Sequence, residues 1–140
     1  MNLNLRAWRY AVSAARAMKK IIIRADEIEA RAELNETATA GAIWQALPIE
    51  GSAKTWGEEI YFRIPVSQDL ETEARELVNL GDLAYWPQGE AFCIFFGVTP
   101  ISSPGEIRPA SAVNIVGQLL DDPKGFLSVA SGTSVRIEKA

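Results

Sequence analysis

Residues 81–97 of the 140-residue chain read GDLAYWPQGEAFCIFFG, two apolar runs joined by a short polar break. The break, Trp86-Pro87-Gln88-Gly89, suits a type I turn, because proline fits the second position of such a turn and glycine the fourth. The flanking runs are rich in aromatic residues, which favour strands. The segment therefore predicts two neighbouring antiparallel strands with a tight connection.

The bulk composition indicates one globular domain. A length of 140 residues suits a single domain, and 48% hydrophobic with 23% charged residues is typical of a packed protein. The net charge of −4 argues against a nucleic-acid partner, since a phosphate backbone would be repelled. No apolar stretch is long enough to span a bilayer, so we expect a soluble cytoplasmic protein without a membrane partner.

The chain has one cysteine and no histidine, which excludes several kinds of site. Cys93 lies in a strand-like apolar run, so we interpret it as a small buried side chain and not as a reactive thiol. Without histidine, Ser-His-Asp and Cys-His nucleophiles and histidine-ligated zinc are excluded. No metal-ligand cluster, phosphate-binding glycine loop or dinucleotide fingerprint is present, so we expect neither metal nor cofactor.

The first seventeen residues have a different composition from the rest. They contain Arg6, Arg9 and Arg16 and no acid, and this spread of arginines disfavours a secretory signal. An added amphipathic helix, an organelle-targeting segment and a start codon set upstream of Met18 stay open as explanations. We therefore divide the chain into a basic N-terminal extension, 1–17, and a domain, 18–140, and expect a chain beginning at Met18 to keep its thermal stability.

The remaining sequence predicts short strands and one clear helix. Alternation of apolar and polar residues predicts strands at 28–34, 53–65 and 135–138, and short apolar runs predict strands at 21–24 and 113–120. Residues 38–47 favour a helix, with Asn35 or Thr37 as its cap and Pro48 after its end.

Three other segments are less regular. Residues 69–80 fit a short helix or a strand near 74–78 about equally, 99–109 must be a loop because of its prolines, and 121–129 predict a turn or short second helix. Many short strands with one clear helix favour a mainly β fold, a closed or nearly closed β-barrel, because closure removes exposed strand edges.

Five strings stand out in this order. They are GAIWQALP at 41–48, GEEIYFRIP at 57–65, GDLAYWP at 81–87, CIFFG at 93–97 and VNIVG at 113–117. With them, the chain from about Met18 to Ala140 resembles the cyclophilin-like domain family, small and mostly uncharacterised prokaryotic proteins. The resemblance implies a cyclophilin-type β-barrel.

True cyclophilins are peptidyl-prolyl isomerases, and the resemblance implies that any such site lies on the outer face of the barrel. There an arginine on one strand meets aromatic and amide side chains. The run Tyr61-Phe62-Arg63-Ile64-Pro65 is similar to that arginine strand, and alternation directs Arg63 outward. The chain departs from the family of isomerases by lacking their histidine and the Gly-Phe-Met-x-Gln run after the arginine strand. The resemblance therefore implies the barrel without most of the isomerase site.

Five residues are candidates for a site. Arg63 could donate to a prolyl nitrogen, or it could be an ordinary outward charge on a strand. The candidate ligand-binding residues are Tyr61, Tyr85, Trp86 and Phe92. Alternation sends about half of the aromatic side chains into the core, and we expect one of Tyr85 and Trp86 to face outward beside the turn.

These observations lead to two functional hypotheses. The first is a barrel of unassigned role that binds a small ligand or peptide segment on its outer face near Arg63 and Trp86. The alternative is a weak peptidyl-prolyl cis/trans isomerase. The partner is an unknown small molecule or peptide, and a homo-oligomer formed through an apolar face stays open.

Overall fold

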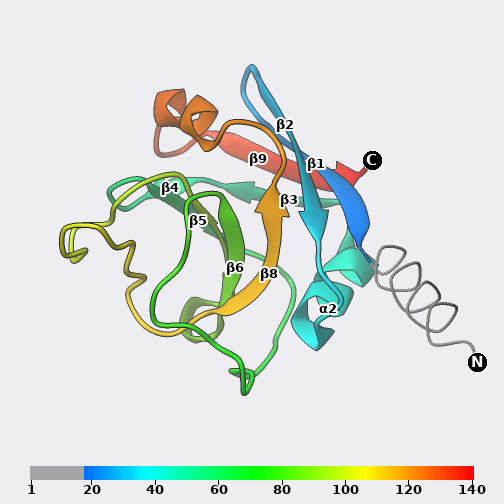
Figure 1. Ribbon diagram of the computed structural model, residues 1–140. Helices are drawn as coiled ribbons and strands as arrows, with labels where there is room; N and C mark the ends of the chain where they lie inside the picture. The colour runs from blue at the N-terminus through cyan, green and yellow to red at the C-terminus, as the bar shows by residue number, and fades with distance from the viewer. Residues whose placement is uncertain (1–17) are drawn as a thin grey trace, which may run out of the picture.

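The computed structural model describes residues 18–140, which form nine strands, one α-helix and two short 3-10 helices (Figure 1). The strands are β1 (Lys19–Ala25), β2 (Ile28–Leu34), β3 (Ile49–Ser52), β4 (Lys54–Thr55), β5 (Glu59–Arg63), β6 (Asp82–Trp86), β7 (Ala91–Phe95), β8 (Asn114–Leu119) and β9 (Ser134–Lys139). The helices are α2 (Ala38–Ala46), η1 (Pro87–Gly89) and η2 (Pro123–Ser128). The predicted basic extension, 1–17, lies outside the described residues and stays a prediction.

The nine strands form one antiparallel sheet that curls into a nearly closed barrel. Their order is β3-β9-β1-β2-β8-β6-β7-β5-β4. The two outermost strands, β3 and β4, are consecutive in the chain and are separated only by the buried Ala53. This short segment pairs with β9 on one side and with β5 on the other, so it joins the two ends of the sheet. The predicted mainly β barrel is therefore confirmed.

The hairpin of β1 and β2 forms as its alternation predicts. Ile21 pairs with Ala32 and Ile23 with Ala30, and all four side chains are buried. Asp26 in the connecting turn has a φ of 56°, in the left-handed region that short polar residues tolerate. Period-two burial on one face of a strand is the physical reason that this register is well specified.

Helix α2 also follows its prediction. The Thr37 hydroxyl oxygen accepts a hydrogen bond from the backbone N–H of Ala40 (3.2 Å), which caps the helix. Ala40 and Ile43 belong to the main core. Pro48, after a cis Leu47–Pro48 peptide bond, ends the helix and leads into β3, a strand that the sequence did not predict.

The barrel interior holds the main hydrophobic core, and a smaller core lies outside the sheet. The interior is filled by large buried side chains, among them Ile21, Ile23, Leu34, Ile43, Ile60, Phe62, Leu83, Tyr85, Phe92 and Ile94. The outer core consists of Val78, Ala84, Cys93, Phe95 and Val113. Cys93 is thus a buried small side chain, as predicted.

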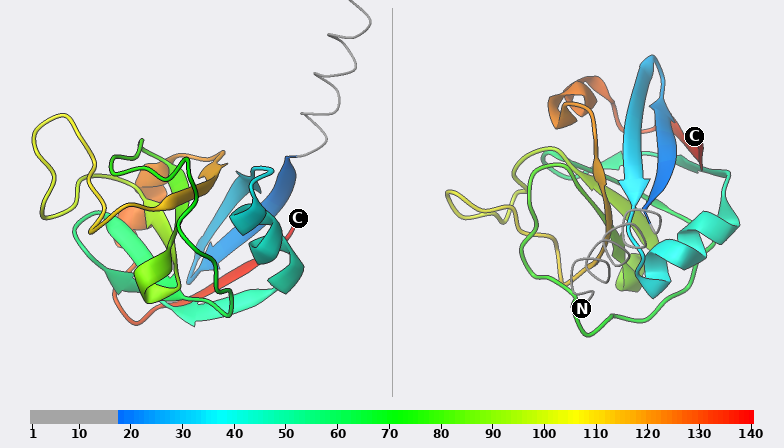
Figure 2. Two further views of the ribbon diagram at one scale, coloured as in Figure 1. Left: turned by 90° about the horizontal axis from the view of Figure 1, so that it is seen from below. Right: turned by 45° about the vertical axis from the view of Figure 1, so that its right-hand side comes forward.

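Two long connections cover this outer core. One runs from β5 to β6 and the other from β7 to β8, and they are joined to each other by a bridge between Val78 and Ile107. A second bridge joins Arg75 to Val113. Segment 69–80 therefore forms neither the helix nor the strand that its composition suggested. In both views of Figure 2, the loop near residue 100 projects on the side of the barrel away from α2.

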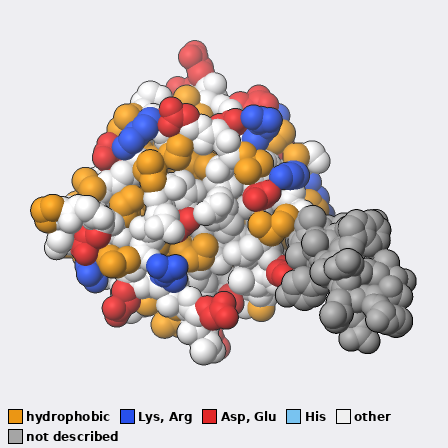
Figure 3. Space-filling view, viewed as in Figure 1, with side chains coloured by type: hydrophobic (Ala, Val, Ile, Leu, Met, Phe, Trp, Pro, Cys, Tyr) orange, Lys and Arg blue, Asp and Glu red, His pale blue; other side chains and the backbone are white. Residues whose placement is uncertain are grey.

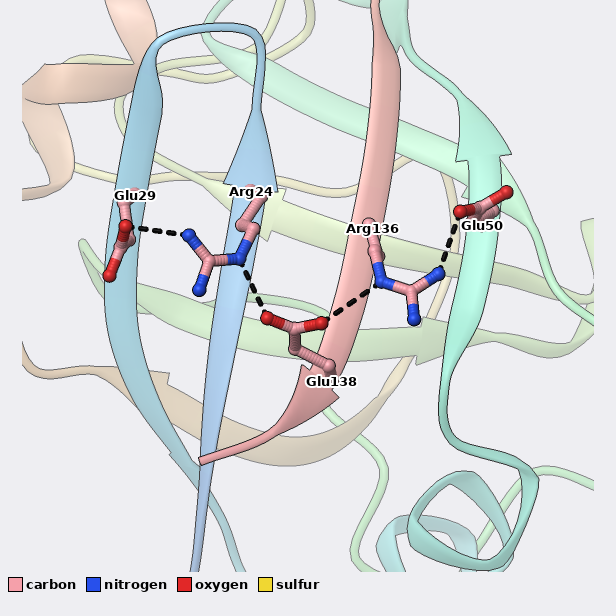
Figure 4. Close-up of polar contacts among 5 residues, drawn as sticks. All are labelled: Arg24, Glu29, Glu50, Arg136 and Glu138. Carbon is pink, nitrogen blue, oxygen red and sulfur yellow. Dashed lines mark hydrogen bonds and ion pairs between the residues drawn. The ribbon is translucent and has the colours of Figure 1, made fainter.

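Charged side chains of both signs are interspersed on the face shown in Figure 3. A row of ion pairs crosses the outer surface of four strands, β2, β1, β9 and β3 (Figure 4). In order across the strands its members are Glu29, Arg24, Glu138, Arg136 and Glu50, with nitrogen–oxygen distances of 2.6, 2.6, 2.9 and 2.7 Å. No helix among residues 18–140 has both the length and the apolar character needed to cross a membrane.

Candidate functional site

The outer face of β5 carries the candidate site residues. Ile60 and Phe62 point into the main core, so Glu59, Tyr61 and Arg63 occupy the opposite face of the strand. The alternation that predicted an outward Arg63 is therefore confirmed. The three outward side chains nevertheless have different surroundings, because the loop between β7 and β8 reaches only part of the strand.

Small residues in the neighbouring strand bring two aromatic rings together. Across the sheet, Tyr61 pairs with Cys93, and Arg63 pairs with Ala91, which in turn pairs with Trp86 on β6. Ala91 and Cys93 leave room above β7 for the rings of Tyr61 and Trp86. The ring centroids are 6.5 Å apart and the ring planes are nearly perpendicular, at 85°. The two rings form a corner on the outer surface of the barrel.

A cavity of about 290 Å³ opens at this corner. Its lining is mostly apolar and comes from three parts of the chain. Glu59, Tyr61 and Trp86 belong to the sheet, Trp56 belongs to the turn between β4 and β5, and Ala110 belongs to the loop between β7 and β8. Partly enclosed apolar sites with a few polar groups are typical of small-ligand binding.

Trp86 is held in place on two sides. Its indole Nε1–H donates a hydrogen bond to the Ser111 hydroxyl oxygen at 2.7 Å. Its ring also lies close to Gly89 in the following turn, where a β-carbon would stand 2.7 Å from two ring carbons. Because van der Waals contact between carbons needs about 3.5 Å, only glycine leaves space for this ring position.

The turn that carries Trp56 is tied to the loop over the outer core. The backbone N–H of Glu58 donates to the carbonyl oxygen of Val98 (2.8 Å), and the N–H of Trp56 donates to the carbonyl oxygen of Glu59 (3.0 Å). Gly57 has a φ of 61°, and a β-carbon there would meet the Val98 carbonyl oxygen at 2.8 Å. Glycine at this position allows the loop to approach closely enough to form the cavity wall.

Glu59 is the most unusual polar group of the cavity. It is only 5% exposed, and among residues 18–140 no nitrogen or hydroxyl donates a hydrogen bond to its carboxylate. Burial raises the pKa of Glu59 to about 7, and the adjacent Cys93 thiol only partly opposes this effect. Burial also raises the pKa of Cys93 well above its usual range, an effect to which Glu59 contributes. The cavity thus contains a carboxyl group that changes charge near neutral pH.

Arg63 lies on the same face but not in the cavity. Its side chain is 79% exposed, and its guanidinium donates to the Glu90 carboxylate at 2.8 Å. Its outward position agrees with the sequence-based interpretation. The structure brings Tyr61 and Trp86 together at the cavity, while Arg63 remains beside it as a solvated ion pair.

Two candidate residues lie elsewhere than the sequence suggested. Tyr85 is fully buried, and its hydroxyl donates to the carbonyl oxygen of Val66 (2.7 Å) and accepts from the backbone N–H of Gln68 (3.2 Å). Phe92 is also fully buried and packs on Phe62 at a centroid distance of 5.6 Å. The placement of Tyr85 and Phe92 on an outer ligand surface was therefore wrong, because strand pairing directs both rings into the barrel.

Trp56, Glu59 and Ala110 were not among the predicted site residues. Glu59 shares the outward face with Tyr61, and this alternation was the available signal. The sequence does not show that the loop carrying Ala110 folds back over the strand. Without that cover, Glu59 would be read as an ordinary solvated carboxylate.

A second, more polar hollow lies between the segment just before α2, the connection from β5 to β6 and strand β8. Two of its lining residues, Glu71 and Asn114, bond to the buried Thr39 of α2. The Glu71 carboxylate accepts from the hydroxyl and backbone N–H of Thr39, and the Asn114 side chain bonds to the Thr39 hydroxyl and the Glu71 backbone N–H. This network ties the connection to the helix. Within residues 18–140, no group of three or more histidine, cysteine or acidic side chains could hold a metal ion.

Comparison with known proteins places the chain among relatives of the same architecture. A family model described as "Cyclophilin-like" matches residues 19–138. The solution structure of a hypothetical protein from Archaeoglobus fulgidus shares 44% sequence identity and a TM-score of 0.76, covering 89% of this chain and 96% of that one. No curated protein matches the chain.

Proposed function

The chain belongs to the cyclophilin-like family, and from this premise we propose that it is a ligand-binding barrel that takes a small molecule on its outer face. The binding site is the cavity beside Trp86. The observation that supports this function is that one buried carboxyl group, Glu59, lines the same cavity as the aromatic side chains Trp56, Tyr61 and Trp86. Because Phe62, Tyr85 and Phe92 fill the core of the barrel, a ligand would bind on the outer face and not in the interior.

The alternative function, weak prolyl isomerisation, has less support. It would need a donor to the prolyl nitrogen inside an apolar pocket. Arg63 is the candidate donor, but it is paired with Glu90 and does not line the cavity. The chain also contains no histidine. Small-ligand binding uses the residues that the structure brings together, whereas isomerisation would require Arg63 to leave its partner.

Nuclear magnetic resonance of the indole N–H groups tests the proposed function. The chain has four tryptophans, and single Trp→Phe substitutions would assign their signals. Cyclohexanol, benzoate, choline and an Ala-Pro peptide serve as neutral, anionic, cationic and proline-bearing probes. We expect at least one probe to shift the signals of Trp56 and Trp86 while leaving that of Trp44, on α2, unchanged.

A cavity-filling variant gives the matched control. Ala110→Leu enlarges an exposed side chain of the cavity lining and should abolish the shifts. Ala130→Leu makes the same change at an exposed position outside that lining and should leave them intact. The proposal fails if no probe of any charge moves the Trp56 and Trp86 signals of the unaltered chain.

A further inference from the structure

We propose that the cavity beside Trp86 recognises an organic ammonium ion, a positively charged nitrogen that carries alkyl groups. The aromatic walls would face the alkylated nitrogen, and the Glu59 carboxylate would neutralise its charge. This inference rests on the proposed ligand-binding function and names the class of ligand.

The arrangement of the aromatic rings supports a cationic ligand. A cation is attracted to the face of an aromatic ring when it lies within about 6 Å of the ring centre, and tryptophan is the strongest partner. The perpendicular rings of Tyr61 and Trp86 offer two surfaces at a corner, and Trp56 adds a third aromatic wall. An alkylated ammonium is weakly hydrated, so an apolar lining removes less favourable hydration from it than from a simple ammonium ion.

No lysine or arginine of residues 18–140 is paired with the aromatic rings that line the cavity. Elsewhere in the described part of the chain, the Trp44 ring lies under two ammonium groups, those of Lys139 at 4.5 Å and Lys19 at 5.4 Å. No lysine or arginine of residues 18–140 lies over Trp56 or Trp86, and none lines the cavity. The aromatic surfaces of the cavity are therefore available to an external cation.

Among the described residues, Glu59 likewise lacks the basic partner that nearby carboxylates have. Glu58, its neighbour in sequence, lies 3.9 Å from the Lys124 ammonium, and Glu90 pairs with Arg63 at 2.8 Å. Glu59 is more deeply buried than either, yet no basic side chain of residues 18–140 forms an ion pair with it or lines the cavity. A buried carboxylate is costly unless it is paired, so a bound cation would supply the missing charge.

Other ligand classes fit the cavity less well. An anion would be repelled by the Glu59 carboxylate. A metal ion would need several oxygen, nitrogen or sulfur ligands, and the rest of the lining is aromatic or alanine. A neutral molecule would leave the carboxylate unpaired.

The ionisation of Glu59 should make binding dependent on pH. Among residues 18–140, the titratable side chains beside Glu59 are the Cys93 thiol on β7 and Tyr61, which lines the same cavity, and no basic side chain lines it. The pKa of Glu59 is about 7, and that of Cys93 is well above its usual range, so Glu59 changes charge near neutral pH and Cys93 does not. Affinity for a permanent cation should therefore rise between about pH 6 and about pH 8.

Choline and its neutral counterpart 3,3-dimethyl-1-butanol separate charge recognition from hydrophobic binding. The two molecules have nearly the same shape, but a carbon atom replaces the charged nitrogen in the alcohol. With the full chain at about pH 8, we expect choline to shift the Trp56 and Trp86 indole signals with an affinity at least roughly tenfold higher than that of the alcohol. Glu59→Gln should remove most of this preference.

The wild-type chain provides a second measurement that does not depend on the variant's folding. Choline affinity should fall roughly tenfold from about pH 8 to about pH 6, while the affinity for the alcohol stays constant. Equal binding of the two molecules would overturn the ammonium inference and leave the proposed function standing. Absence of shifts with every probe would overturn both.

One further titration identifies the source of the ammonium group. The same trimethylammonium head occurs in free small molecules such as choline and on trimethylated lysine side chains. A peptide with trimethyllysine is compared with the same peptide carrying unmodified lysine. Tighter binding of the methylated peptide than of choline would identify trimethylated lysine side chains as the ligand. Tighter binding of choline would identify a free small molecule. Either order supports an alkylated ammonium as the recognised group.

Discussion

At the scale of single residues, small side chains control where the large rings of the outer face can lie. Ala91 and Cys93 separate Tyr61 from Trp86 across β7. Gly89 leaves the space that the Trp86 ring occupies. The cavity thus depends on residues that contribute almost no surface to it. Substitutions at these positions should change the positions of the rings at the cavity more than they change the stability of the barrel.

Gly89→Ala is expected to displace the Trp86 ring. The added β-carbon would stand 2.7 Å from two ring carbons, so the ring must move and its hydrogen bond to Ser111 should weaken. The loss of stability should be modest, on the order of 1 kcal/mol, because the ring is only half-buried. The Trp86 indole N–H signal and the melting temperature measure the two effects. Gly125→Ala, where nothing lies within 4 Å, is the control, and an unchanged Trp86 signal in the first variant would contradict the packing described.

Glu59→Gln is expected to flatten the dependence of stability on pH. The carboxyl pKa is about 7 in the folded chain and near 4.5 without burial, so the folded state binds the proton more tightly. The resulting stabilisation is complete below about pH 4.5, falls as the pH rises toward 7 and is absent above it. The wild-type chain should lose on the order of 3 kcal/mol over this window, at about 1.4 kcal/mol per pKa unit.

Urea unfolding at about pH 5 and about pH 8 measures this effect. The glutamine variant should be less sensitive to pH than the wild-type chain. Glu27→Gln, at an exposed position in the turn between β1 and β2, should keep the wild-type dependence. Identical pH profiles for Glu59→Gln and the wild-type chain would mean that Glu59 is not held in a poorly solvated site.

At the scale of elements, one carboxylate bridges two neighbouring strands that place like charges opposite each other. Arg24 and Arg136 are direct cross-strand partners of β1 and β9, an arrangement of like charges that disfavours pairing. Glu138 accepts a hydrogen bond from each of them. Glu29 and Glu50 extend the row to β2 and β3. The row in Figure 4 therefore links four neighbouring strands of the barrel.

Glu138→Gln is expected to destabilise the barrel most strongly at neutral pH. Hydrogen bonds from Arg24 and then Arg136 lower the pKa of Glu138, so its contribution is present above the unfolded pKa and is lost as the pH falls through the lower folded value. Unfolding by urea should separate variant and wild type at about pH 7 and bring them together at strongly acidic pH. Glu29→Gln, which removes a carboxylate with Arg24 as its single partner, should have the smaller effect. A larger effect of Glu29→Gln would contradict this account.

The elements also show what the sequence could and could not predict. The hairpin of β1 and β2 and the helix α2 follow from local alternation and capping, because their side chains face one core. Strand β3 carries no such pattern, and its Gly51 lies so close to Phe62 that a β-carbon would stand 2.6 Å from the ring. Segment 69–80 has the composition of a helix, but contacts of Glu71 and Val78 with other parts of the chain determine its course. Tertiary contacts thus overrode local preference in both segments.

At the scale of the whole molecule, the barrel and its covering loops have separate roles. The filled interior stabilises the fold, and the two long connections build a second core on the outer face. The cavity lies at the edge of this second core, where the loop carrying Ala110 meets β5. Alternation predicted the outward face of β5 correctly, but loop cover converts Glu59 from a solvated into a buried group. That conversion arises from long-range packing, which a single sequence does not display.

This arrangement predicts that the whole protein is not an efficient prolyl isomerase. In a protease-coupled assay with an Ala-Pro peptide, we expect no rate above the uncatalysed reaction, whose barrier is about 18–20 kcal/mol. The physical reason is that Arg63, the one candidate donor, is bound to Glu90 and lies outside the apolar cavity. Turnover that disappears in Arg63→Ala and persists in Lys54→Ala, a change of another exposed cation, would contradict this expectation. Such turnover would indicate that the functional site lies on the Arg63 side of β5 and not at the corner formed by Tyr61 and Trp86.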